Sequence, residues 1–231
     1  MYFGGYVVNS HLIEILATIE TRIQERHLLK HPFYQAWSAG TLTLSSLQEY
    51  SKQYYQQVEA FPTYVSAVHA NCPVLPVRQQ LLENLIEEER GTEHHPELWL
   101  RFAEALGVSR DEVTNALPLP ETRNLLNTFR TLTRDRSYLA GVVALLAYEA
   151  QIPEVAATKI DGLRRFYGIN HERGLSFFQV HLQADRFHAN TARQIVYQHL
   201  TLAEAETLVP TCEQAVDALW GMLDGVYARY C

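Results

Sequence analysis

The sequence predicts an all-α fold, a bundle of seven to eight helices. Apolar residues recur at helical spacing along almost the whole chain, whereas the alternating pattern of strands is nearly absent. The chain has 231 residues, of which 47% are hydrophobic, and this suits one globular domain with a sizeable core. Since no low-complexity linker, internal repeat or domain break interrupts it, we expect residues 1–231 to form a single domain.

Capping residues indicate where the first two helices begin. Ser10 can cap a helix at 11–28, and Thr43 can cap a long helix that continues to about residue 70. Pro62 lies within this second helix, where it removes a backbone hydrogen bond and is expected to cause a kink.

Proline and glycine indicate several of the later boundaries. Pro76 suits the first turn of the third helix, and Gly91 marks its end. The segment ALPLPET at 116–122 is a connector. Pro153 lies inside the longest apolar stretch, which we expect to form one buried helix. The helices after residue 75 are therefore expected at about 76–91, 95–107, 122–136, 137–168, 171–200 and 202–230.

Charge and composition argue against several classes of function. The net charge is −7, from 19 basic and 26 acidic side chains, and no basic run indicates a nucleic-acid surface. Residues 1–10 lack the charged and long apolar regions of a signal peptide, and no apolar run reaches the ~18 residues of a membrane span. Cys72, Cys212 and Cys231 are widely spaced, which indicates reduced thiols in a cytoplasmic protein.

The stretch FFQVHLQADRFHAN contains the clearest candidate site. His181, Asp185 and His188 occupy positions i, i+4 and i+7, at angles of about 0, +40 and −20 degrees around a helix. One helical face therefore offers two imidazoles and a carboxylate, a combination found in metal sites. The alternative is a polar helix face whose spacing is a coincidence.

Glu149 lies in an apolar helix, between Leu146 and Ile152. A carboxylate in such surroundings must be paired, protonated or bound to a metal. It is therefore either a further metal ligand or half of a buried salt bridge with an arginine from another helix.

Glu88 and His95 form a second candidate group. They are seven residues apart, but Gly91 lies between them, so helical spacing does not determine whether they meet. The competing candidates are Glu87, Glu89 and His94. These three residues can equally belong to a solvated charge cluster.

Three carboxylates and three imidazoles suffice to hold two divalent metals in a helix bundle. Imidazole and carboxylate together suit iron and manganese, whereas thiolate favours zinc or copper, and no CxxC motif is present. Two divalent ions bring more positive charge than three carboxylates neutralise, which leaves room for a ligand derived from O2. The residue set thus predicts a dinuclear centre for oxygen activation.

Several longer blocks extend over nearly the whole chain. They are HPFYQAW at 31–37, LQEYSKQYY at 47–55, AFPTYVSAVH at 60–69, EEERG…LW at 87–99 and AGVVALLAYEAQIP at 140–153, together with H-x3-D-x2-H. With these blocks the chain resembles the heme-oxygenase-fold, non-heme dimetal proteins. Among these proteins, the chain is similar to the 4-aminobenzoate synthase family, which includes the chlamydial protein associating with death domains. The broader superfamily includes the pyrroloquinoline-quinone synthases and the thiaminase-2 proteins.

The resemblance implies a heme-oxygenase-like bundle and an activity. The implied metal ligands, all present without substitution, are Glu88, His95, Glu149, His181, Asp185 and His188. The implied cofactors are two divalent metals, Fe/Fe or Mn/Fe, with O2 as co-substrate and an external reductant. The implied reaction is formation of 4-aminobenzoate, the folate precursor, independently of chorismate, by a protein that is a homodimer.

The resemblance also implies that the ring carbons come from a tyrosine of the protein itself. That tyrosine matches Tyr34, a second tyrosine matches Tyr50, and a proposed amino-group donor matches Lys159. The chain has 13 tyrosines, and Tyr34 can also be an amphipathic residue at the core edge beside Phe33 and Trp37. Lys159 can also be a solvated lysine; as a nitrogen donor it must be neutral, which requires burial.

Three other functions are possible alternatives. Two are found in the same superfamily, and the third belongs to a different class. An oxidase like the pyrroloquinoline-quinone synthases would bind a planar anionic substrate without metal, and the complete ligand set argues against it. A thiaminase-like hydrolase would need a cysteine in the helix of Glu149, but none lies between Cys72 and Cys212. A protein-interaction module is the third alternative, and it has no reason to hold two metals.

Overall fold

The computed structural model describes residues 10–231 and is helical throughout this part, without a strand. Residues 1–9, on which the expected lack of a signal peptide depends, lie outside the described residues. The elements are α1 (Ser10–Glu25), a 3-10 helix η1 (Leu28–Lys30), α2 (Pro32–Ala39), α3 (Leu44–Asn71), α4 (Leu75–Glu89), α5 (His95–Ala105), α6 (Arg110–Thr114), α7 (Pro120–Arg134), α8 (Tyr138–Glu149), α9 (Ile152–Phe166), α10 (Glu172–His199) and α11 (Leu202–Tyr230). The all-α prediction is confirmed.

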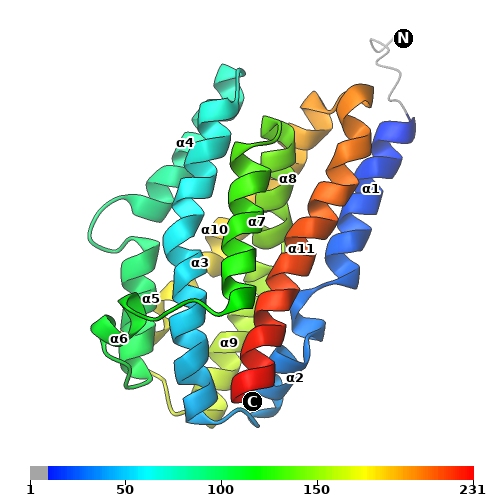
Figure 1. Cartoon of the computed structure of the whole chain (residues 1–231). Helices are drawn as coiled ribbons and strands as arrows, with labels where there is room; N and C mark the ends of the chain where they lie inside the picture. Colours follow the sequence, from blue (N-terminus) through cyan, green and yellow to red (C-terminus); the bar gives the residue numbers. More distant parts are fainter. Residues whose placement is uncertain (1–9) are drawn as a thin grey trace, which may run out of the picture.

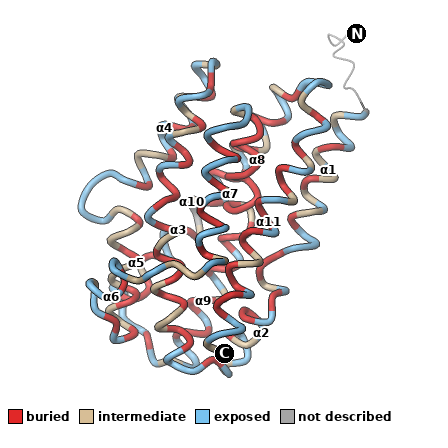
Figure 2. Tube along the Cα trace, in the orientation of Figure 1, coloured by how far each residue is buried: buried red, intermediate tan, exposed pale blue. Residues whose placement is uncertain are grey.

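The long helices lie side by side in an elongated bundle (Figure 1). Helix α3 packs against α4, α5, α7 and α8, and α11 packs against α1, α7 and α8. Helix α10 contacts α5, α8 and α9, so that α8 is covered on several sides. Buried positions follow the inward faces of these helices (Figure 2). The core is therefore shared between helices from both halves of the chain.

The described chain has more helices than the seven to eight that the sequence predicts. Helices α2 and α6, of eight and five residues, are too short to produce a clear period. The apolar stretch expected as one helix at 137–168 is divided into α8 and α9. Pro153, in the first turn of α9, has no N–H to donate to the carbonyl of Glu149, so the first helix ends there.

The stretch from α8 through α9 is the one part of the described chain that is long and apolar enough to span a membrane. However, 89% of its most apolar window is buried inside the fold. Burial of this kind is the property of a core helix in a soluble protein.

Candidate metal centre

All six predicted metal ligands are buried, and they meet in the interior between α4, α5, α8 and α10. They form two groups, in each of which the potential ligand atoms lie within 4.8 Å of one another. The first group is Glu88, His95 and His181, and the second is Glu149, Asp185 and His188. The structure thus brings together every residue of the predicted set.

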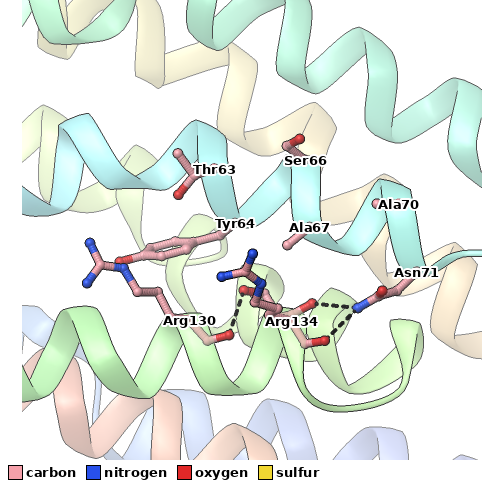
Figure 3. Close-up of a pocket in the computed structure, with 9 residues that line it drawn as sticks. Thr63, Tyr64, Ser66, Ala67, Ala70, Asn71, Arg130 and Arg134 are labelled. Carbon is pink, nitrogen blue, oxygen red and sulfur yellow. Dashed lines mark hydrogen bonds between the residues drawn. The ribbon is translucent and has the colours of Figure 1, made fainter.

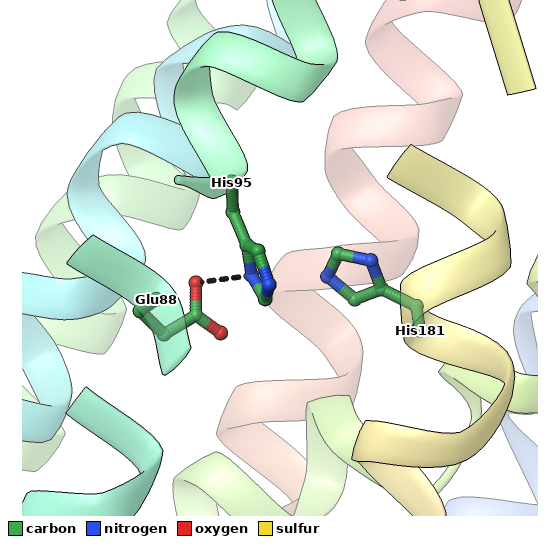
Figure 4. A group of neighbouring side chains, drawn as sticks. All are labelled: Glu88, His95 and His181. Carbon is green, nitrogen blue, oxygen red and sulfur yellow. Dashed lines mark ion pairs between the residues drawn. The ribbon is translucent and has the colours of Figure 1, made fainter. Parts of the chain in front are cut away.

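A tight turn, not helical spacing, brings Glu88 and His95 together. Helix α4 ends at Glu89, and Gly91 adopts φ 85°, a left-handed conformation that favours glycine. The chain reverses there, and His95 is the first residue of α5. Its Nδ1 lies 2.6 Å from Oε2 of Glu88 (Figure 4).

The three competing candidates near this turn have other positions. His94 caps α5, where its Nδ1 accepts a hydrogen bond of 3.3 Å from the backbone N–H of Glu97. Glu89 is exposed. Glu87 is exposed as well, but its Oε2 lies 3.1 Å from Nε2 of His188, on the outer side of the second group.

His181 is prepared to bind through one ring nitrogen. Its Nδ1 lies 2.5 Å from the carbonyl oxygen of Phe177, to which it can donate, and this leaves Nε2 as the free donor atom for a metal. The ring faces that of His95, with centroids 4.3 Å apart (Figure 4). Burial holds the pKa of His181 well below its usual value, so the imidazole is neutral, the form that binds metals.

Within residues 10–231 no arginine pairs with Glu149, so the Arg salt bridge that was its alternative is not found there. Its Oε1 accepts a 2.7 Å hydrogen bond from Nδ2 of Asn84. Nδ1 of His188 lies 3.6 Å from Oε1 of Glu149 and 3.8 Å from Oδ1 of Asp185. Burial raises the pKa of Glu149 to about 8 and that of Asp185 to about 6.

Several ligand atoms in both groups are buried without a hydrogen-bond partner among the described residues. They are Nδ1 of His95, Oδ2 of Asp185 and both ring nitrogens of His188; the ring nitrogens face carboxylate oxygens as ion pairs, without hydrogen-bond geometry. Unpartnered buried polar atoms are rare and costly. A divalent cation in each group would accept these lone pairs and stabilise the buried carboxylates. The donor set of imidazoles and carboxylates therefore fits two ions of the iron or manganese type.

Lys159, Tyr50 and Tyr34 form a second buried cluster. Nζ of Lys159 donates to Oη of Tyr50 over 2.7 Å, and the Oη atoms of Tyr50 and Tyr34 are 3.0 Å apart. Tyr34 is 1% exposed and Lys159 2%, so neither is the core-edge or solvated residue of the alternative interpretations. Burial lowers the pKa of Lys159 well below its usual value and raises those of both phenols. Burial thus favours the neutral form of all three groups.

Sequence reasoning missed a second phenol pair and a polar neighbour of Glu149. Oη of Tyr54 lies 2.8 Å from Oη of Tyr148, and both rings are buried. Asn84 precedes Glu88 by four residues, and this helical spacing was a signal that could have identified it. Tyr148 directly precedes Glu149, but nothing in the sequence indicates its contact with Tyr54.

A groove between α3 and α7 is separate from both clusters (Figure 3). It has a volume of about 350 Å³. Its lining residues are Thr63, Tyr64, Ser66, Ala67, Ala70, Asn71, Arg130, Thr133 and Arg134. It contains none of the predicted site residues. By contrast, a cavity of about 20 Å³ with a mainly apolar lining reaches Glu149 and His188.

Comparison with known proteins places the chain in a family. Residues 48–220 match the family described as iron-containing redox enzyme. The chain is 45% identical to a 4-aminobenzoate synthase of Nitrosomonas europaea, over 92% of this chain and 91% of the relative. It is 38% identical to a 4-aminobenzoate synthase of Chlamydia pneumoniae, over 89% of this chain and 91% of the relative.

More distant relatives and solved structures agree with this fold. A pyrroloquinoline-quinone synthase of Pseudomonas aeruginosa is 27% identical over 87% of this chain and 82% of the relative. The crystal structure of a CADD-like protein of unknown function from Nostoc punctiforme superposes with a TM-score of 0.77 at 20% identity, covering 94% of this chain and 99% of that one. The chain is thus an oxidoreductase of heme-oxygenase-like fold that belongs to the 4-aminobenzoate synthase family of the iron-containing redox enzymes.

Proposed function

We propose that this protein is an O2-dependent dimetal oxygenase that forms 4-aminobenzoate from its own Tyr34, with Lys159 as the source of nitrogen. The observation that carries the proposal is the buried chain from Nζ of Lys159 through Oη of Tyr50 to Oη of Tyr34. It supports the proposal because a phenol ring and a neutral amine, the two components of the product, are held within one dry cluster.

The metal ligands would be the two buried groups of three residues described above. Two divalent metals, Fe/Fe or Mn/Fe, would supply the oxidising power there, given O2 and electrons from an external reductant. The family's description as iron-containing supports the presence of iron. The cavity beside Glu149 and His188 has about 20 Å³, which suits a molecule no larger than water or O2.

The chain's own residues hold the reacting groups in a defined protonation state. Lys159 meets no carboxylate in the cluster, and burial alone lowers its pKa, so its amine keeps a free electron pair for attack on an oxidised ring. Tyr50 lies between this amine and Tyr34, where its hydroxyl can pass a proton from the phenol toward nitrogen. The surrounding aromatic rings exclude water, which would otherwise compete with the amine.

The quaternary structure and location belong to the same proposal. We propose a cytoplasmic homodimer that binds neither nucleic acid nor membrane. The net charge of −7 supports the lack of nucleic-acid binding, and the three free thiols Cys72, Cys212 and Cys231 support the cytoplasmic location. The homodimer rests on the family resemblance alone.

The test is rescue of a 4-aminobenzoate auxotroph that lacks the chorismate route. The wild-type gene should restore growth in air but not under strict anaerobiosis, and His181→Ala should not restore it. His94→Ala, which changes a neighbouring capping histidine outside the ligand set, is the control. Rescue without oxygen would contradict the oxygenase. Failure of well-expressed, metal-loaded wild type in air would favour an oxidase that acts on another small molecule.

A further inference from the structure

A column of aromatic rings connects the candidate metal ligands to the phenols. The ring centroid of Phe177 lies 4.2 Å from that of His181, and the indole of Trp99 lies 4.8 Å from Phe177. On its other side Trp99 stacks on Tyr54 at 4.8 Å and meets Tyr50 at 5.9 Å. The column therefore runs without a break from His181, a candidate ligand on α10, to Tyr50. The hydroxyl of Tyr50 is hydrogen-bonded to that of Tyr34.

Trp99 is the member of this column that can be oxidised and is positioned between its two ends. The indole is completely buried, and its Nε1–H donates to the backbone oxygen of Ser51 over 2.8 Å. An indole loses an electron far more readily than the phenyl ring of Phe177. Nζ of Lys159 lies 5.3 Å from the centre of the indole, so Trp99 also borders the amine cluster.

We propose that Trp99 relays an electron from the Tyr34–Tyr50 phenol pair to the oxidised metal centre. The inference rests on the proposed function. In the relay, the indole would give one electron through Phe177 and His181 to metals held by the six ligands, which would accept it after oxidation by O2. The phenol pair then returns one electron to the indole.

The proton released in this step stays within the cluster of Tyr34, Tyr50 and Lys159. Tyr34 loses its hydroxyl proton to Oη of Tyr50 as it loses the electron, and Tyr50 passes its own proton to the neutral amine of Lys159. The products are a neutral phenoxyl radical at Tyr34 and an ammonium group at Lys159, which must release this proton before its nitrogen attacks the ring. The indole ends as it began, so it is a relay and not a reactant.

Trp37 provides a matched control for this role. It is a buried tryptophan whose ring lies 5.9 Å from Tyr50 and 6.3 Å from Tyr34. Among the described residues it makes no ring contact with His181 or Phe177, so it borders the same phenols without reaching the ligands. Trp37→Phe and Trp99→Phe therefore remove similar volumes beside the same tyrosines, but only Trp99→Phe interrupts the column.

The experiment measures loss of the Tyr34 side chain by peptide mass spectrometry, per O2 consumed, in metal-loaded protein. Metal content and the urea midpoint are recorded for each variant. Wild type and Trp37→Phe should lose Tyr34. Trp99→Phe should bind metals and consume O2 but lose at least about tenfold less Tyr34. Trp99→Tyr, which restores an oxidisable ring, should recover much of the loss.

The outcomes separate the relay from the proposed function. Intact Tyr34 in wild type would refute the proposed function itself. Equal Tyr34 loss in wild type and Trp99→Phe would refute only the relay. If Trp99→Tyr binds metals but loses as little Tyr34 as Trp99→Phe, Trp99 acts by packing. This result would also overturn the relay.

A second readout needs no metal. In metal-free protein that carries Trp37→Phe and Trp220→Phe, Trp99 is the remaining tryptophan. Flash photolysis should create an indole radical that decays as a phenoxyl radical grows, because Tyr54 and Tyr50 lie next to the indole. Decay of the indole radical without any phenoxyl signal would overturn the proposed electron transfer.

Discussion

Replacement of Lys159 with methionine should make the metal-free protein more stable. The amine is 2% exposed, and its polar contact is the 2.7 Å hydrogen bond to Oη of Tyr50. Burial lowers its pKa in the folded state, so the unfolded chain binds a proton that the folded chain does not. The pKa of the lysine in the unfolded chain is about 10.4. As the pH falls from this value to the lower pKa of the folded state, the buried amine reduces the free energy of unfolding by a growing amount.

The magnitude follows from this proton linkage. The penalty grows by about 1.4 kcal/mol for each pH unit within that window. Methionine has a similar length, carries no proton and packs well against aromatic rings. Loss of the hydrogen bond to Tyr50 costs about 1 kcal/mol. Lys159→Met should therefore gain up to about 3 kcal/mol at pH 7.5, and the gain should shrink as the pH rises.

A competing effect would reverse the sign. Nζ of Lys159 lies within 4.7–5.5 Å of five aromatic ring centres, and a charged amine there would gain cation–π energy. If that gain exceeded the cost of burial, methionine would destabilise the protein at every pH.

The assay is urea unfolding of metal-free wild type and variants at pH 7, 8 and 9. Lys30→Met is the control, because Lys30 is exposed, and its stability should change by less than about 0.5 kcal/mol. A pH-independent difference, or a less stable Lys159→Met, would refute the view that Lys159 is a neutral buried amine.

Other predictions concern the ligands, the packing and the reaction. Because burial raises the pKa of Glu149 to about 8 and metal binding must displace its proton, metal affinity should rise as the pH increases from 6 to 8 in titrations with Mn²⁺; a flat profile would contradict this. Glu149→Gln should lower the metal content per chain, measured by metal analysis. Gly162→Ala places a Cβ atom 2.6 Å from the buried ring of Trp37 and should cost about 1–3 kcal/mol in urea unfolding; an unchanged midpoint would show that the contact relaxes freely. Tyr34→Phe should keep the metal content but form no 4-aminobenzoate, and product at the wild-type yield would indicate Tyr50 as the donor.

Periodic features of this fold and site could be predicted from the sequence. The helical face of His181, Asp185 and His188 follows from spacing alone, and all three are buried on one side of α10. The all-α class follows from apolar periodicity. The division between α8 and α9 could have been inferred from Pro153, whose missing N–H ends the preceding helix.

Contacts that depend on how distant helices pack could not be predicted from the sequence. Lys159 and Tyr50 are 109 residues apart, and no local pattern relates them. Glu88 and His95 meet because the chain reverses at Gly91, and spacing along a helix does not encode a reversal. The family resemblance implied a role for each of these four residues. It could do so because a family's site residues reflect how its helices pack, which a single sequence does not reveal.

The most direct test of the central claim is to follow the carbon atoms of the product. Protein expressed with ring-labelled tyrosine, purified, loaded with iron and manganese, and exposed to O2 and reductant in unlabelled buffer should release labelled 4-aminobenzoate. The peptide that contains Tyr34 should lose its side chain in proportion. Unlabelled product, or labelled product that appears only when free tyrosine is added, would contradict the account and make the protein an ordinary oxygenase of a small molecule.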